Sequence, residues 1–132
     1  MDELTYAQQM LTRGGYKLVV CSGGHVHISE EGGLSSLLEI AESADWKGAA
    51  AADAVVGKAA ALIFARLGVS CVYAQTMSKS AARVLEENGI AYRYGKCVGA
   101  LLNADGSDYC PYEKAVRGVN DPEEAVKILI KQ

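Results

Sequence analysis

The segment DAVVGKAAALIFARLG, from Asp53 to Gly68, is the feature that most constrains how this chain can fold. Apolar residues fill nearly every position between Ala54 and Ala65, so a helix here would have almost no polar face. Such a helix must be covered on most sides, as in the centre of an α/β protein. We therefore predict a buried, central helix that opens near Asp53.

The rest of the chain alternates between strand and helix patterns. Gly23 and Gly24 separate the segments YKLVVCS and HVHIS, which predicts a tight β-hairpin. A short buried strand, GAAAA, precedes the apolar helix, and the strands VSCVYA and IAYRY follow helices that end at Gly68 and Gly89. Such alternation pairs strands in parallel through right-handed crossovers. We therefore expect an α/β fold, a three-layer α/β/α sandwich whose mixed sheet has an antiparallel hairpin followed by parallel strands.

Length and composition narrow the classes of function. The chain has 132 residues, which suits a single domain over residues 1–132. A net charge of -3 without a Lys/Arg cluster argues against nucleic acid, because phosphate neutralisation supplies most of that affinity. No apolar run reaches the roughly 18 residues of a membrane helix, and the first residues do not resemble a signal peptide. We expect a cytoplasmic protein without a membrane partner; homo-oligomer formation is left open.

Cysteine and histidine spacing does not predict a metal site. The four cysteines are scattered, without a CxxC pair or a nearby histidine cluster. His25 and His27 alternate along the second hairpin strand, where two solvated imidazoles are the simpler interpretation. The sequence therefore predicts no metal and no cofactor.

A glycine and a lysine lie side by side within the apolar segment. Lys58 follows the predicted end of a parallel strand, where ligands bind in α/β sheets and free helix N–H groups favour anions. Gly57 costs the helix up to ~1 kcal/mol relative to alanine, and its missing side chain would admit a ligand or a neighbouring backbone. Asp53 would cap the helix. The alternative is that Gly57 only allows tight packing and Lys58 extends to solvent.

A second helix start of this kind follows the next strand, in the sequence TMSKSA. Ser78 is a candidate N-cap, and Thr76, Ser80 and Lys79 place hydroxyls and a cation beside exposed N–H groups. Two such starts after successive parallel strands lie at the same edge of the sheet, so one cleft is expected between them. The alternative is that Ser78 only caps its helix.

Cys110 and Glu113 are candidate catalytic residues in addition to Lys58. A thiol near a helix N-terminus gains acidity from the helix dipole, whereas a carboxylate one turn later opposes that effect. No histidine lies nearby in the sequence to act as a base. A structural thiol is the simpler interpretation, and a Cys–Glu pair for acid–base chemistry is the alternative.

Three motifs carry a family resemblance. The segments VVGKAAAL (55–62), CPYEK (110–114) and DPEEA (121–125), in this order and spacing, resemble the small prokaryotic proteins grouped as domain of unknown function 1893. The resemblance implies a cytidine deaminase-like fold. Zinc deaminases open the two helices after the hairpin with His/Cys-x-Glu and Pro-Cys-x-x-Cys. Here residues 53–58 and 76–80 stand at those places without a histidine or cysteine, which implies a deaminase-type cleft without zinc.

The first functional hypothesis is a protein that binds a nucleotide-like or other anionic small molecule in this cleft. Asp53 would cap the helix or contact a ribose hydroxyl, and Gly57 would admit the ligand. The phosphate would be met by three residues at the two helix starts: Lys58, Ser78 and Lys79.

The second hypothesis is a metal-free group-transfer enzyme. Lys58 would be the electrostatic stabiliser or nucleophile, with Cys110 and Glu113 as acid–base partners. A scaffold with a vestigial cleft is a third interpretation. Hydrolytic deamination is not expected, because no zinc ligands are present to lower the pKa of water toward ~7.

Overall fold

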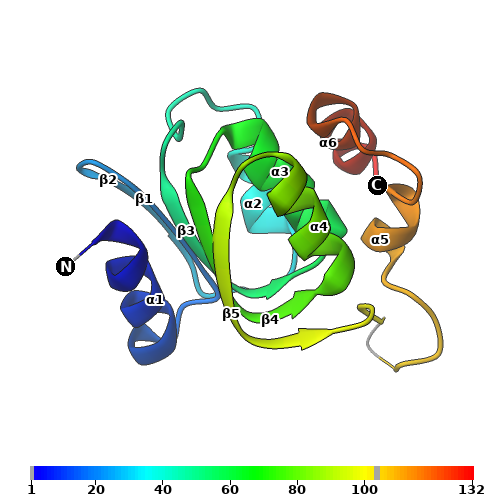
Figure 1. Cartoon of the computed structure of the whole chain (residues 1–132), viewed down its shortest axis with the longest axis horizontal. Coiled ribbons are helices and arrows are strands. Elements are labelled where there is room, and N and C mark those ends of the chain that lie inside the picture. The colour runs from blue at the N-terminus through cyan, green and yellow to red at the C-terminus, as the bar shows by residue number, and fades with distance from the viewer. Residues whose placement is uncertain (1, 103–104) are drawn as a thin grey trace.

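The strands form one five-stranded mixed sheet (Figure 1). The computed structural model describes residues 2–102 and 105–132. Its strands are β1 (Leu18–Ser22), β2 (His25–Ser29), β3 (Ala50–Val56), β4 (Cys71–Ser78) and β5 (Ala91–Val98). They lie in the order β2-β1-β3-β4-β5, with β1 antiparallel to β2 and β3, and the pairs β3–β4 and β4–β5 parallel. The predicted α/β class, the hairpin and the mixed sheet are confirmed.

The helices pack against both faces of this sheet (Figure 1). They are α1 (Glu3–Gly14), α2 (Ser35–Glu39), α3 (Lys58–Leu67), α4 (Lys79–Glu87), α5 (Pro111–Ala115) and α6 (Pro122–Ile130). Helix α1 covers one face, whereas α2, α3, α4 and α6 contribute to the core on the other. In the part of the chain that the structure describes, no helix has the length and hydropathy to cross a membrane.

Alternation along the strands builds the two halves of the core. In β1, Val19 packs toward α1 and Val20 toward the opposite helices; in β3, Ala52 and Ala51 divide in the same way. Successive side chains of a strand point to opposite faces, so a sheet that is covered on both sides needs apolar residues at consecutive positions. This explains why β1 and most of β3 read as continuous apolar runs.

The apolar segment divides into a strand and a helix, which corrects the predicted start of the helix. Strand β3 continues through Val56, Gly57 is the N-cap, and α3 begins at Lys58. Asp53 is therefore not a helix cap; it pairs with Leu18 and Ala74 in the sheet. An apolar run fits a covered strand as well as a buried helix, and valines favour the strand.

Helix α3 itself is buried, as predicted. Its residues from Ala59 to Phe64 are each at most 3% exposed. The helix lies against α4 and α6, and Gly68 ends it in the left-handed conformation, with a φ of 77°. The remaining part of the apolar segment therefore forms the centre of the larger core.

Ser78 caps α4, as its position in the sequence indicates. Its hydroxyl accepts a hydrogen bond from the Ala81 N–H at 3.1 Å, and the residue is fully buried. We predict that Ser78→Ala lowers the free energy of unfolding by about 1–2 kcal/mol, because it leaves a buried helix N–H without its partner. Urea denaturation measures the loss. The exposed Ser35→Ala is the control, and an equal effect of both variants would contradict the capping role.

Candidate functional site

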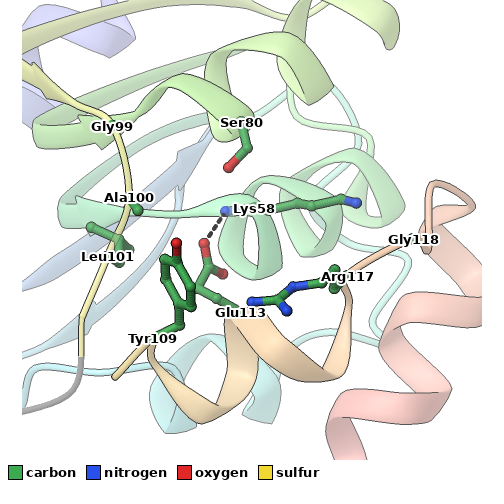
Figure 2. A pocket seen from close by; sticks show the side chains of 9 residues that line it. All are labelled: Lys58, Ser80, Gly99, Ala100, Leu101, Tyr109, Glu113, Arg117 and Gly118. Atoms are coloured by element: carbon green, nitrogen blue, oxygen red, sulfur yellow. Dashed lines mark hydrogen bonds between the residues drawn. The ribbon is translucent and has the colours of Figure 1, made fainter. Parts of the chain in front are cut away.

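A cavity of about 390 Å³ lies at the starts of α3 and α4, beyond the carboxyl ends of β3 and β4 (Figure 2). Lys58 is the first residue of α3, and Ser80 is the second residue of α4. The segment before α5 and the end of α5 supply the opposite wall. The cavity is lined by Lys58, Ser80, Gly99, Ala100, Leu101, Tyr109, Glu113, Arg117 and Gly118. Below we call it the basic cavity, after Lys58 and Arg117.

The N-terminus of α3 is occupied by a carboxylate of the protein itself. Glu113 Oε1 accepts the Lys58 N–H and Oε2 accepts the Ala59 N–H, both at 2.8 Å (Figure 2 draws the first). A carboxylate at this position satisfies two free N–H groups and interacts favourably with the helix dipole. The anion expected at this helix start is therefore Glu113, on α5.

Gly57 is required by this contact. A Cβ atom at position 57 would lie 2.4 Å from Glu113 Oε1 and 2.5 Å from Leu101 Cδ1. The backbone of Gly57 has a φ of -100°, which other residues adopt freely, so the need for glycine is one of space. The close approach predicted at Gly57 is present, and the side chain of Glu113 makes it.

A second cavity of about 490 Å³ lies on the side of Glu113 toward β3 and the loop before α2. Leu101 and Glu113 line both cavities. Its wall is mostly apolar, and it contains Lys17, Gly32, Gly33, Leu34, Asp53, Ala54, Val55, Gly57, Ala59, Ala60, Leu101, Leu102, Cys110, Tyr112 and Glu113. Below we call it the Asp53 cavity.

Asp53 is a buried carboxyl group, only 8% exposed. Burial raises the pKa of Asp53 to about 7, because removal from water disfavours the charged form. The backbone N–H groups of Val55 and Ala54 act in the opposite direction, and the bond from Val55 is long, at 3.4 Å. A carboxyl group with this pKa exchanges its proton near neutral pH.

The structure separates the residues that the sequence assigned to one cleft. Lys58 lines the basic cavity, whereas Gly57 and Asp53 line the Asp53 cavity. Ser78 is buried in its capping role, and Lys79 is exposed; neither lines a cavity described here. Ser80, two residues after the cap, takes the place at the cavity wall that was expected for Ser78 and Lys79.

The residues of the group-transfer hypothesis are divided in the same way. Cys110 lines the Asp53 cavity and Lys58 the basic cavity, with Glu113 bordering both. Cys110 occupies the N-cap position of α5, and its side chain makes no capping hydrogen bond. Both Glu113 oxygens accept helix N–H groups, which hold this carboxylate at the start of α3.

Tyr109 and Arg117 are site residues that the sequence did not single out for a ligand. The Arg117 guanidinium lies 5.1 Å from the centre of the Tyr109 ring, a cation–π contact that orients it. Figure 2 shows the guanidinium and the Tyr109 hydroxyl on the same side of the cavity as Glu113. The position of Arg117 after α5 depends on tertiary packing, so no local pattern could have identified this residue.

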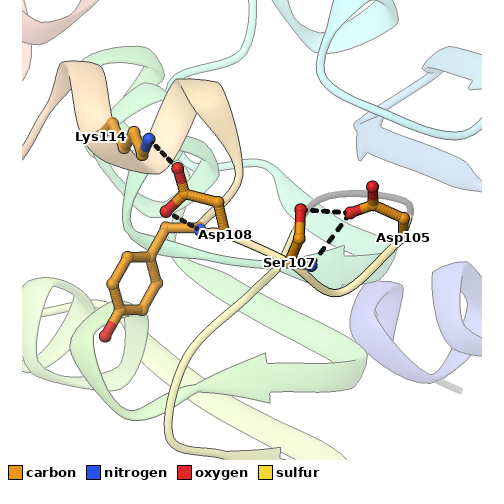
Figure 3. A network of polar contacts seen from close by, with 5 residues as sticks. Asp105, Ser107, Asp108 and Lys114 are labelled. Carbon is orange, nitrogen blue, oxygen red and sulfur yellow. Dashed lines mark hydrogen bonds and ion pairs between the residues drawn. The ribbon is translucent and has the colours of Figure 1, made fainter.

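The segment that leads into α5 is held by polar contacts (Figure 3). Asp105 accepts from the Ser107 N–H at 2.9 Å and from its hydroxyl at 2.6 Å. Asp108 accepts the Tyr109 N–H at 2.8 Å and forms an ion pair with Lys114. These bonds fix the backbone from which Tyr109 and Cys110 extend toward the two cavities.

The fold and the site define a single-sheet α/β protein with two cavities on either side of a carboxylate-capped helix start. A family model described as Domain of unknown function (DUF1893), TM1506, matches residues 6–132. The chain belongs to this family. It is similar to the crystal structure of a DUF1893 family protein (TM1506) from Thermotoga maritima, with 28% identity, a TM-score of 0.88, and coverage of 98% of this chain and 88% of that chain. No curated protein matches the chain.

We predict that Gly57→Ala destabilises the protein by about 1–3 kcal/mol, because its Cβ overlaps the Glu113 carboxylate. Glu113→Ala alone costs about 2 kcal/mol, because it removes two charge-assisted hydrogen bonds. The double variant should lose less free energy of unfolding than the two single variants together, since the clash with the carboxylate is gone. Chemical denaturation of the four proteins tests this, and strict additivity would contradict it.

Asp53 makes stability depend on pH. Its pKa is 3.8 when unperturbed and about 7 in the folded state, so the folded protein binds the proton more tightly. The contribution of Asp53 to stability is therefore fully present below about pH 4, is lost as the pH rises through about 7, and is then constant. We predict that Asp53→Asn removes this decrease and stabilises the protein at about pH 8 by up to roughly 4 kcal/mol. A stability difference independent of pH, in denaturation series, would contradict the prediction.

Proposed function

We propose that this protein binds a small molecule that carries a phosphate or similar anionic group, and that the basic cavity receives this group. The observation that carries the proposal is the convergence of Lys58, Arg117 and Ser80 on one cavity. A guanidinium, an ammonium and a hydroxyl are the groups with which proteins hold phosphate oxygens. A nucleotide-like ligand is the class we favour.

The balance of charge in the basic cavity supports an anionic ligand. The negative charge of Glu113 faces the N–H groups of α3, which compensate it. No ion pair of Lys58 is found within residues 2–102 and 105–132. Ser80 also contributes a backbone N–H from the first turn of α4, which has no acceptor inside the helix. The cavity therefore offers donors and positive charge to an incoming group.

The place of the cavity in the fold is a second support. We propose that the chain is a three-layer sandwich of the cytidine deaminase-like type, with an antiparallel hairpin followed by two parallel crossovers. In that arrangement the starts of the two crossover helices border the ligand cleft, and here Lys58 and Ser80 lie at those starts. The ligand would meet cationic and hydroxyl groups there.

Inorganic pyrophosphate and a nucleoside monophosphate serve as probes, with binding measured by calorimetry and thermal shift. We predict that Lys58→Ala and Arg117→Ala each weaken pyrophosphate binding by roughly tenfold, the equivalent of about 1.4 kcal/mol per lost charged contact. The melting temperature of the unliganded Lys58→Ala variant stays close to that of the original protein, because Lys58 is only partly buried.

Lys79→Ala is the matched control, since Lys79 is exposed and lies outside the basic cavity. It should bind pyrophosphate as the original protein does. If pyrophosphate stabilises the Lys58→Ala variant as much as the original protein, Lys58 has no part in anion binding and the proposal fails.

A further inference from the structure

The Asp53 cavity contains a buried acid whose partners are backbone N–H groups and not a cationic side chain. Asp53 is 92% removed from solvent, since its exposed fraction is 8%, and it lines the cavity wall. Among the described residues, the Asp53 side chain accepts a long hydrogen bond from the Val55 N–H, at 3.4 Å, and the Ala54 N–H also acts on this carboxyl group. Burying a carboxyl group is costly unless its oxygens are paired. A ligand that enters the cavity with a charged hydrogen-bond donor would pair with the Asp53 carboxyl group.

The other titratable groups around this cavity do not neutralise Asp53. Lys17 is exposed to solvent, and no Coulombic effect of a lysine contributes to the pKa of Asp53. The Glu113 carboxylate also borders this cavity but is paired with the N–H groups of α3, and Cys110 is a free thiol. The described residues also hold no group of three His, Cys, Asp or Glu side chains that could share a metal ion. The interior of the cavity is therefore acidic, in contrast to the basic cavity.

The rest of the wall is suited to an apolar body. Leu34, Val55, Leu101 and Tyr112 line the space around Asp53. Ligand cavities in proteins are commonly apolar, with a few polar groups that fix the orientation of the ligand. One buried acid in an apolar wall is such an arrangement, and the volume of about 490 Å³ accommodates a compact molecule.

We propose that the Asp53 cavity is a second binding site, which takes a small, mainly apolar molecule that ends in a protonated nitrogen, such as an amine or amidine. The nitrogen donates charge-assisted hydrogen bonds to the Asp53 carboxylate, and the apolar body contacts the leucine and tyrosine side chains. This site is distinct from the basic cavity, because Asp53 lines one cavity and Lys58 the other, with Glu113 and Leu101 lining both.

The probe is benzamidine, a planar aromatic cation, with benzamide and benzoate as uncharged and anionic analogues of the same shape. Titrations at about pH 8 are followed by calorimetry and by the backbone amide signals of Ala54 and Val55. We expect benzamidine to bind at least roughly tenfold more tightly than either analogue, and to shift both amide signals. Its affinity should fall by at least about tenfold at about pH 5, where Asp53 is protonated.

Asp53→Asn keeps the size of the side chain and removes its charge, so the variant is expected to fold. It should lose at least roughly tenfold in benzamidine affinity, whereas the exposed control Asp45→Asn should lose nothing. Lys58→Ala should bind benzamidine normally, and Asp53→Asn should bind pyrophosphate normally. The proposals for the two sites can therefore be contradicted independently of each other. Equal binding of benzamidine and benzoate, or undiminished binding to Asp53→Asn, would overturn the proposal.

Discussion

The carboxylate of Glu113 attaches α5 to the start of α3, and both cavities depend on this attachment. The two hydrogen bonds at 2.8 Å join α5 to α3, beside the packing of Tyr112 and Val116 against the core. The contact is specific because the space above Gly57 admits no further atom. The N-terminus of α3, which would attract an anion, is thereby occupied by the Glu113 carboxylate.

This attachment also divides the space at the sheet edge into two compartments of opposite charge. Lys58 and Arg117 face one compartment, and Asp53 faces the other, with Glu113 between them. A carboxylate already paired with helix N–H groups separates them without adding free charge to either. In the two proposed sites, electrostatic selectivity would come from these few side chains, since a small number of polar groups fixes the orientation of a ligand.

Sequence patterns predicted the scaffold well and the site only in part. The hairpin turn, the buried helix and the Ser78 cap follow from local rules, because turn glycines, apolar periodicity and capping residues act within a few positions. The helix start was misplaced to Asp53, because an apolar run does not distinguish a covered strand from a buried helix. The role of Glu113 could not be predicted, since its partners at Lys58 and Ala59 lie more than 50 positions away in the chain.

The distance in sequence between Lys58 and Glu113 affects the order in which contacts form during folding. The hydrogen bond from Lys58 to Glu113 closes a loop of 55 positions, whereas the β1–β2 hairpin needs only two linking residues, Gly23 and Gly24. Long loops lose more entropy on closure and generally close after local contacts. Contacts within the hairpin can therefore form before Glu113 reaches α3, and until it does the amino end of α3 is open to solvent.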